Sequence, residues 1–356
     1  MNKVKVGIVG CGAIHSTHCR ALAEIENAEL AGVYDVIPER AQEAATAFST
    51  TAYATLPQLL DAVDSVTVCT PSGLHAEVGL QAAKVGKHVL CEKPIDIHLD
   101  KATRLIEDCR KNKLKLGVIS QHRFAPGVRE VKEMIEKGAL GKVLHCDVYN
   151  KWYRTQGYYD SGDWRGTREL DGGCMMNQGI HYIDLGQWLM GGVQNVQCRA
   201  FTLAHDIECE DAAYAFIEYK NGAIGLLQVA TTCYPGFAER VEIHGTIGSV
   251  VIEGDKVIFT DIDSNAAESG FYGKGITAHP VPPAQPNSAA SNPLNLWDIL
   301  HREQVQDFIN AILEDRDPLV TGEEAIKPVQ EILACYESAA DMGKVVAPKE
   351  LATTRH

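Results

Sequence analysis

Residues 3–19, KVKVGIVGCGAIHSTHC, decide the fold of this chain. An apolar run over residues 4–9 passes directly into Gly10-Cys11-Gly12, and a helix-like stretch follows. A second apolar run, AELAGVYD, then ends at Asp35. A strand, a glycine turn, a helix, a second strand and an acidic residue in this order predict a dinucleotide-binding βαβ unit.

The glycine turn has a clear role in such a unit. Gly10 would make the tight turn, and Gly12 would let the backbone approach a pyrophosphate at the helix N-terminus, where amide groups favour anions. Asp35 would accept hydrogen bonds from the ribose hydroxyls and repel a 2′-phosphate, which favours NAD over NADP. The third glycine position holds His15, so an ordinary strand-to-helix turn is the alternative. The predicted cofactor contacts here are Gly10, Gly12, Ala13, Ile14 and Asp35.

The overall composition excludes several classes of protein. The 356 residues carry 47 acidic and 33 basic side chains, a formal net charge of −14, which argues against nucleic-acid or anionic membrane partners. No apolar run is long enough to cross a bilayer and no signal-peptide pattern opens the chain, so we expect a cytoplasmic protein. The 11 cysteines are scattered and form no CxxC pair, so we expect buried free thiols and no metal site.

The first 121 residues alternate short apolar runs with amphipathic stretches. This alternation predicts an NAD-binding domain over residues 1–121, a doubly wound parallel Rossmann sheet with helices on both faces. The expected strands are residues 4–9, 30–34, 65–70, 87–91 and 115–119. The expected helices are residues 37–48, 56–62, 75–85 and 99–111.

The pattern changes in the second predicted domain, residues 122–356, which would bind substrate and form the oligomer. A helix at residues 126–137 is followed by longer strands, and Asn221-Gly222 is a hairpin signal. We expect an α/β domain with an open, largely antiparallel sheet, covered by helices on one face and by a partner subunit on the other. The expected strands are residues 142–151, 193–202, 211–219, 223–230, 240–245 and 249–253. Residues 280–293 indicate a surface loop, and closing helices at 296–313 and 323–342 could pack back on the first domain.

Two loops follow strands at the edge where a Rossmann sheet binds its cofactor. The first is Thr70-Pro71-Ser72-Gly73 with His75, for which a turn and helix cap is the alternative interpretation. The second is Glu92-Lys93-Pro94, where a desolvated lysine could hold a substrate hydroxyl. The predicted cofactor contacts are Thr70, Pro71, Ser72, His75, Glu92 and Lys93.

Residues 171–184, DGGCMMNQGIHYID, form a third motif. If the chain is helical from Cys174, Asn177 and His181 are four residues apart on one face, and Asp184 could orient the imidazole. Histidine titrates near neutral pH and suits general acid–base work, although a helical histidine is often structural. The preceding glycine pair indicates close approach of a ligand.

An aromatic and arginine-rich segment, residues 151–168, reads KWYRTQGYYDSGDWRGTR. Aromatic faces stack on sugar rings, and arginines bind carboxylates or phosphates, so this segment suits a sugar with an anionic group. The alternative is a loop that packs against a partner subunit. The predicted substrate contacts in this segment are Tyr153, Arg154, Trp164 and Arg165.

Taken together, these motifs resemble the Gfo/Idh/MocA oxidoreductase family over nearly the whole chain. The similar stretches are GCGAIHSTHCRAL, TPSGLHAE, CEKP, QHRF, GGCMMNQGIHYIDLGQWLMG and the two C-terminal helical segments. The resemblance implies a Rossmann domain, a second α/β domain with an open sheet, and homodimers or homotetramers formed through that sheet. It also implies NAD(P)-linked oxidation of a hydroxyl of a sugar, sugar nucleotide or inositol, or the reverse reduction.

The resemblance also assigns roles by position. Lys93 and His181 match the family's active-site lysine and histidine, and Asn177 stands where inositol dehydrogenases carry an aspartate, which disfavours that substrate. In QHRF, Gln121 would contact the cofactor and Arg123 the substrate. The leading hypothesis is an NAD-dependent dehydrogenase with His181 as base and Lys93 polarising the oxygen. The alternatives are an NAD-recycling lyase or glycosidase without net redox, and a non-catalytic NAD-binding regulator.

Overall fold

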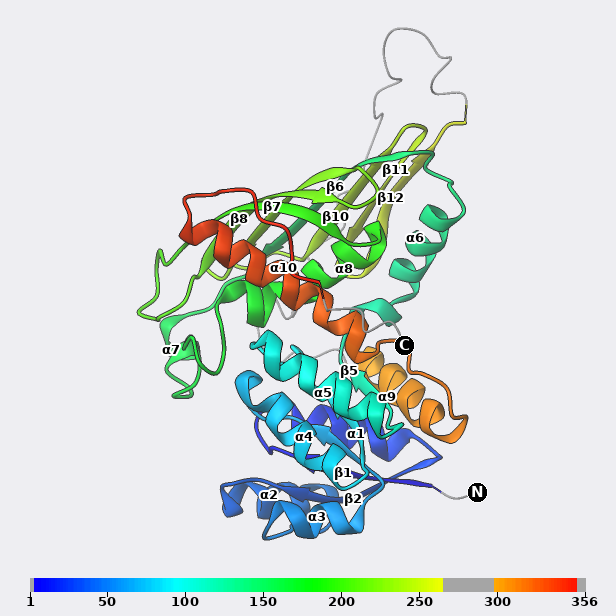
Figure 1. The fold of residues 1–356 in the computed structure, drawn as a ribbon, viewed down its shortest axis with the longest axis vertical. Helices are drawn as coiled ribbons and strands as arrows, with labels where there is room; N and C mark the ends of the chain where they lie inside the picture. Colours follow the sequence, from blue (N-terminus) through cyan, green and yellow to red (C-terminus); the bar gives the residue numbers. More distant parts are fainter. Residues whose placement is uncertain (1–2, 265–297, 351–356) are drawn as a thin grey trace, which may run out of the picture. The chain divides into compact units, whose positions relative to one another are not determined.

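The computed structural model describes residues 3–264 and 298–350 (Figure 1). The chain forms two compact units. The first contains Met1–Gln121, Glu169–Asp171 and Leu296–Val329, and the second contains His122–Arg168, Gly172–Asn295 and Gln330–His356. In the described ranges, no helix is long and apolar enough to span a membrane.

The first unit has a five-stranded parallel sheet in the order β2-β1-β3-β4-β5. Its strands are β1 (Val4–Val9), β2 (Ala28–Tyr34), β3 (Ser65–Val68), β4 (His88–Cys91) and β5 (Leu116–Val118). All four residues of β3 are buried, as expected for a parallel strand covered on both faces. The chain order reverses between β1 and β3, and open α/β sheets bind ligands at such a point, at the carboxyl ends of the strands.

Helices from both ends of the chain complete the first unit. They are α1 (His15–Glu24), α2 (Pro38–Phe48), α3 (Leu56–Ala62), α4 (His75–Lys84), α5 (Leu99–Lys111) and α9 (Asp298–Leu313), with a short 3₁₀ turn, η1 (Ser72–Leu74). Helix α9 packs against α1, and Phe308 and Ile309 join the apolar core that contains Ile8 and Leu22. The Rossmann core therefore depends on apolar side chains almost 300 residues away along the chain.

The second unit has a seven-stranded mixed sheet in the order β12-β11-β10-β6-β9-β8-β7 (Figure 1). Its strands are β6 (Val143–Lys151), β7 (Val193–Phe201), β8 (Ala212–Tyr219), β9 (Ile224–Ala230), β10 (Arg240–Gly245), β11 (Gly248–Glu253) and β12 (Lys256–Ile262). Strands β6 and β9 pair in parallel, and the other neighbouring pairs are antiparallel. The predicted fold class, a Rossmann sheet with a second domain built on a largely antiparallel sheet, is confirmed.

Helix α8 (Ile180–Met190) packs against β6 and β10, and α6 (Pro126–Glu136) packs against β11 and β12. Helix α10 (Gly322–Ala340) begins in the first unit and ends in the second, where the Ser338 hydroxyl accepts a hydrogen bond from the Cys198 amide of β7. The opposite face of β8 and β9 presents large apolar side chains to solvent. These exposed side chains are Tyr214, Phe216, Ile224 and Leu226.

The sequence-based boundaries agree with the described elements to within two residues. Strand β12 and the short helix α7 (Gln156–Tyr159) were not predicted. The predicted helix after Cys174 begins as a π-helix, η3 (Met175–Gly179), and continues as α8. The predicted surface loop at residues 280–293 lies outside the described residues.

Candidate active site

The glycine turn of the first unit is shaped by close backbone contact. Gly10 has φ +96°, and a Cβ there would lie 2.7 Å from the carbonyl atoms of Cys69, so the position requires glycine. Gly12 is exposed, and within the described ranges no atom lies within 4 Å of an added Cβ. Residue Ile14, at the N-terminus of α1, makes no side-chain cap hydrogen bond. The turn therefore leaves open space and backbone N–H groups where a pyrophosphate would bind.

Asp35 ties the end of β2 to this turn. Its Oδ2 accepts a hydrogen bond from the Cys11 amide at 2.7 Å, and its Oδ1 accepts one from the Ile37 amide at 2.8 Å. Burial, followed by the charge of Asp35, raises the pKa of the Cys11 thiol to about 12, so this cysteine is a neutral packing residue. His15, at the third glycine position, bonds the Gly12 carbonyl and places its ring edge on Phe48.

The position of Asp35 leads to a prediction about cofactor choice. Asp35→Ser should narrow the preference for NAD over NADP because the carboxylate that repels a 2′-phosphate is removed. Fluorescence titration of both cofactors measures the two affinities, with Asp61→Ser on the surface of α3 as the matched control. Tighter binding of NADP than of NAD by the unaltered protein would overturn the assignment.

His75 joins the loops that follow β3 and β4. Its two ring nitrogens lie 2.8 Å from the Thr70 carbonyl oxygen and 2.6 Å from the Pro94 carbonyl oxygen, and the side chain is buried. The amide of Gly73 donates to the carbonyl of Leu170 at 2.9 Å. The predicted cofactor loop is therefore held rigidly at the carboxyl edge of the sheet, and His75 supports it from within the protein.

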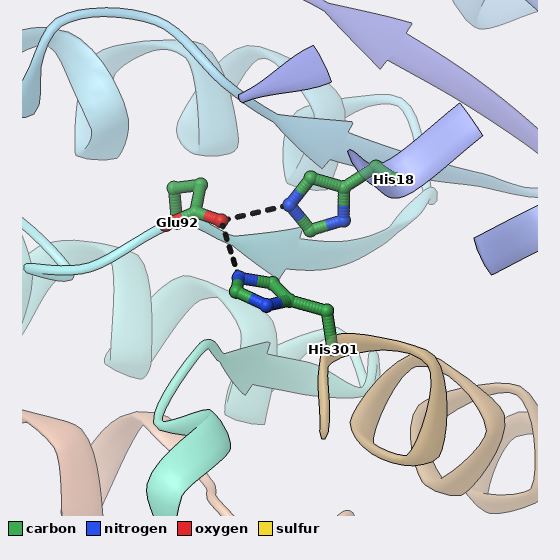
Figure 2. A group of neighbouring side chains, drawn as sticks. All are labelled: His18, Glu92 and His301. Carbon is green, nitrogen blue, oxygen red and sulfur yellow. Dashed lines mark hydrogen bonds and ion pairs between the residues drawn. The ribbon is translucent and has the colours of Figure 1, made fainter. Parts of the chain in front are cut away.

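Glu92, next to Lys93, lies in a buried cluster with His18 of α1 and His301 of α9 (Figure 2). Its Oε1 is 2.8 Å from His18 Nε2 and 3.7 Å from His301 Nε2, and its Oε2 accepts the Lys93 amide at 3.1 Å. Burial by itself would raise the pKa of Glu92, but hydrogen bonds from the two histidines hold it well below its usual range. This geometry favours anchoring of the Lys93 backbone by Glu92 over the predicted contact with the cofactor.

The same cluster has a donor set that zinc accepts, since the three ligand atoms lie within 4.8 Å of one another. However, 2.8 Å between His18 Nε2 and Glu92 Oε1 is a hydrogen-bond distance. The other ring nitrogen of His18, Nδ1, is buried and has no hydrogen-bond partner among the described residues, whereas metal-bound imidazoles normally use that nitrogen as a donor. Burial lowers the pKa of His18, so we interpret the cluster as a buried network of hydrogen bonds between a carboxylate and imidazoles.

The glycine pair before His181 makes room for protein side chains. A Cβ on Gly172 would lie 2.6 Å from the Met176 Cβ, and one on Gly173 would lie 1.8 Å from Glu210 Oε2. Glu210 accepts the Met175 amide at 3.0 Å, and burial raises the pKa of Glu210 to about 7. The expectation that the glycine pair marks close approach of a ligand is not supported here, because the space is filled by Met176 and Glu210.

Asn177 lies in the π-helix and His181 in the first turn of α8. Single-turn π-helices within α-helices are frequent at functional sites, since they re-aim the side chains of one turn. Asn177 is 9% exposed, whereas His181 is half-buried. The ring of His181 makes an edge contact with His122 at 5.0 Å between centroids and faces Trp152 at 6.5 Å.

Arg123 and Asp184 form a buried ion pair. The Arg123 guanidinium donates to both carboxylate oxygens of Asp184, at 2.8 and 2.5 Å, and lies over the Trp188 ring at 5.1 Å. Arg123 is only 1% exposed. This bidentate pair favours a structural role for Arg123 over contact with substrate. Arg123 also binds both oxygens of Asp184, the carboxylate that was expected to orient His181.

The segment of residues 151–168 stacks its arginines on its aromatic rings. The Arg154 guanidinium lies 4.8 Å from the Trp152 ring centroid, and Arg165 lies 4.3 Å from Tyr158 and 4.6 Å from Trp164. The Tyr158 hydroxyl accepts from Arg165 at 2.6 Å and from Gln178 at 3.1 Å, which ties this segment to the π-helix beside Asn177. Tyr153 makes an edge contact with Tyr234 at 5.2 Å.

Several buried carboxylates of the second unit were not identified from the sequence. Among them, Glu210, Glu239 and Asp255 bond the π-helix, Trp152 and His122 respectively. Each partner is distant along the chain, so spacing carries no signal for these contacts. Gly254-Asp255 between two apolar runs was the one available sign, because it marks a tight turn.

Comparisons with known proteins agree with this description. The family model "Oxidoreductase family, NAD-binding Rossmann fold" matches residues 4–120, and "GFO/IDH/MocA C-terminal domain" matches residues 128–251. The chain is 27% identical to myo-inositol 2-dehydrogenase of Thermotoga maritima, covering 90% of this chain and 92% of that protein. It is also 27% identical to 2,7-anhydro-N-acetylneuraminate hydratase of Mediterraneibacter gnavus, covering 97% of both.

Among solved structures, the WlbA dehydrogenase of Bordetella pertussis, in complex with NADH and UDP-GlcNAcA, superposes with a TM-score of 0.84. Its sequence is 31% identical to this chain, and the alignment covers 99% of both chains. Together the two family models match more than half of the chain. The chain therefore belongs to the Gfo/Idh/MocA family and is an NAD-dependent dehydrogenase acting on CH–OH groups.

Proposed function

We propose that this enzyme oxidises a ring hydroxyl of a sugar or sugar nucleotide that carries an anionic group. The observation that carries this proposal is the pair of stacked arginines, Arg154 and Arg165, joined through Tyr158 to the π-helix beside Asn177. Guanidinium groups bind carboxylates and phosphates, and aromatic faces stack on sugar rings. The WlbA dehydrogenase structure contains UDP-GlcNAcA, and this ligand of a similar protein supports the proposed substrate class.

The roles of individual residues follow from their chemistry. The first unit would hold the dinucleotide through Gly10, Gly12 and Asp35, and NAD supplies the hydride acceptor when bound. Lys93 would donate a hydrogen bond to the substrate oxygen and stabilise its developing negative charge. His181 would accept the hydroxyl proton, and the Asn177 amide would fix the hydroxyl's orientation without adding a second ionisable group.

The substrate class is tested by an absorbance assay for NADH with a matched panel. Each neutral sugar is paired with its uronate and its phosphate, with and without a nucleoside diphosphate. We expect the anionic members to show the higher kcat/KM. Equal or higher kcat/KM for the neutral members would reject the anionic class while leaving the dehydrogenase assignment intact.

We also propose that the enzyme is a homodimer or homotetramer formed through the open face of the second unit's sheet. Phe216 and Leu226 are 50% and 45% exposed on adjacent strands, and contiguous apolar patches of this kind mark interaction surfaces. The same face is hollowed into a groove of about 430 Å³ lined by residues such as Tyr149, Tyr214 and Met342.

The cytoplasmic location stays a prediction from the sequence.

The oligomer proposal predicts the effect of a charge on this face. Phe216→Glu combined with Leu226→Glu should dissociate the assembly, because association would bury unpaired carboxylates in an apolar interface. Light scattering gives the molar mass, and Val36→Glu combined with Val85→Glu, at exposed positions of the first unit, is the control. An unchanged mass for the double variant would place the interface elsewhere.

A further inference from the structure

The ring of His181 lies near two aromatic side chains, His122 and Trp152, that are themselves anchored to buried carboxylates. His122 Nδ1 donates to Asp255, at 2.9 Å from Oδ1 and 2.7 Å from Oδ2. Trp152 Nε1 donates to Glu239 Oε1 at 2.6 Å. His122 and Asp255 are 2% and 7% exposed.

Asp255 connects three elements around His181. It occupies the turn between β11 and β12 with φ +67°, and its Oδ1 also accepts the Tyr182 hydroxyl at 2.9 Å. Tyr182 follows His181 directly in α8, while His122 belongs to the short 3₁₀ turn Gln121–Phe124. An added Cβ on Gly127 would lie 2.9 Å from the Asp255 carbonyl oxygen, so α6 also packs tightly on this turn. One carboxylate thereby holds both His122, which contacts the His181 ring, and Tyr182, the next residue along α8.

The charges around His122 come from every element packed on it. The charged groups are Asp255 from the hairpin turn, Glu239 before β10 and Asp184 from α8, and the neutral titratable groups are His181 and Tyr182 from α8. Burial by itself lowers the pKa of His122, but the charge and hydrogen bonds of Asp255 raise it above its ordinary value. Burial raises the pKa of Glu239 and holds the pKa of Tyr182 well above its ordinary value. Asp255 and His122 are therefore a buried carboxylate–imidazolium pair.

We propose that the Asp255–His122 ion pair is a positioning pair that fixes the His181 ring and keeps His181 neutral, ready to accept a proton. A second imidazolium would lie 5.0 Å from the first, and like charges at this range disfavour each other. The edge contact between the two rings restricts the rotation of the His181 side chain. This inference rests on the proposed role of His181 as the base.

The test replaces the His122 imidazolium by an uncharged side chain that can still donate a hydrogen bond to Asp255. In His122→Gln, the acid limb of the kcat/KM profile should move up by about one pH unit, because His181 then keeps its proton to higher pH. Asp255→Asn should move the limb in the same direction, since His122 loses the partner that holds its proton. His244→Gln is the matched control, because His244 bonds Ser249 at the β10–β11 hairpin and its loss should leave the limb unmoved.

A second readout does not depend on catalysis. NMR titration of ¹³C-labelled histidines reports the midpoint of His181 directly, and the same upward shift is expected in His122→Gln. A folded His122→Gln protein with both the NMR midpoint and the pH profile unchanged, or moved down, would overturn the inference. If His181→Ala keeps its turnover while the NMR midpoint still shifts in His122→Gln, the pair acts on His181 as inferred and the base assignment fails instead.

Discussion

Replacing His181 or Lys93 by alanine is expected to lower kcat by about 10²–10⁴-fold while the fold and NAD affinity persist, because general acid–base groups contribute that much. His181 would take the hydroxyl proton, and Lys93 would stabilise the charge left on the oxygen. Each lies in its own unit of the structure, on a rigid support. Lys93 follows β4 with its amide bonded to the buried Glu92, and His181 opens α8 directly after the π-helix.

The controls separate chemistry from folding. Lys137→Ala, at the exposed residue that follows α6, and His244→Ala on β10 remove the same side chains from positions outside the site and should leave kcat unchanged. Melting temperature and NAD titration check that each variant folds and binds. A loss much below ten-fold for His181→Ala would show that another group moves the proton.

Truncating the stacked arginines is expected to weaken substrate binding selectively. A hydrogen bond to a charged group contributes about 1.5–3 kcal/mol, which corresponds to a rise in KM of roughly ten- to one-hundred-fold for Arg165→Ala on an anionic substrate. Arg154→Ala should act in the same direction and also destabilise the fold, because the guanidinium is 4% exposed between Trp152 and Tyr158. Burial lowers the pKa of Arg154, which agrees with a desolvated cation.

The alternative role for these arginines is contact with a partner subunit, and the same variants decide between the two. Arg240→Ala is the matched control, since Arg240 pairs with Glu242 and Glu253 on the sheet of the second unit. KM should rise while the molar mass from light scattering stays fixed. Dissociation of the assembly with unchanged affinity in the remaining oligomer would assign the segment to the interface.

The Rossmann half was predictable because its determinants are local. Strand β1, the turn at Gly10 and the acid at Asp35 follow one another within one βαβ unit, and each imposes its own backbone geometry. The prediction for the second half of the chain was less complete. Strand β12 was missed because its side chains are mostly half-exposed and show no strict alternation between buried and exposed positions.

The environment of the candidate base could not be predicted from spacing. The pattern of residues 171–184 placed Asn177 and His181 on one helix, but the π-helical turn depends on the distant Glu210. Asp184 was expected to orient His181 because it lies three residues away, yet its carboxylate oxygens bind Arg123. Contacts between residues far apart along the chain arise only in the folded protein, and single-sequence patterns contain no record of them.

The central claim is net hydride transfer from a sugar hydroxyl to NAD. The most direct measurement follows NADH absorbance and sugar composition together when the enzyme is mixed with excess NAD and the panel of anionic sugars. The account predicts NADH in equal amount to the oxidised sugar, and loss of both in His181→Ala. Conversion of a sugar with no accumulation of NADH would contradict this account and would indicate a reaction without net oxidation or reduction. The relative from Mediterraneibacter gnavus is named as a hydratase, which is a reaction of that kind.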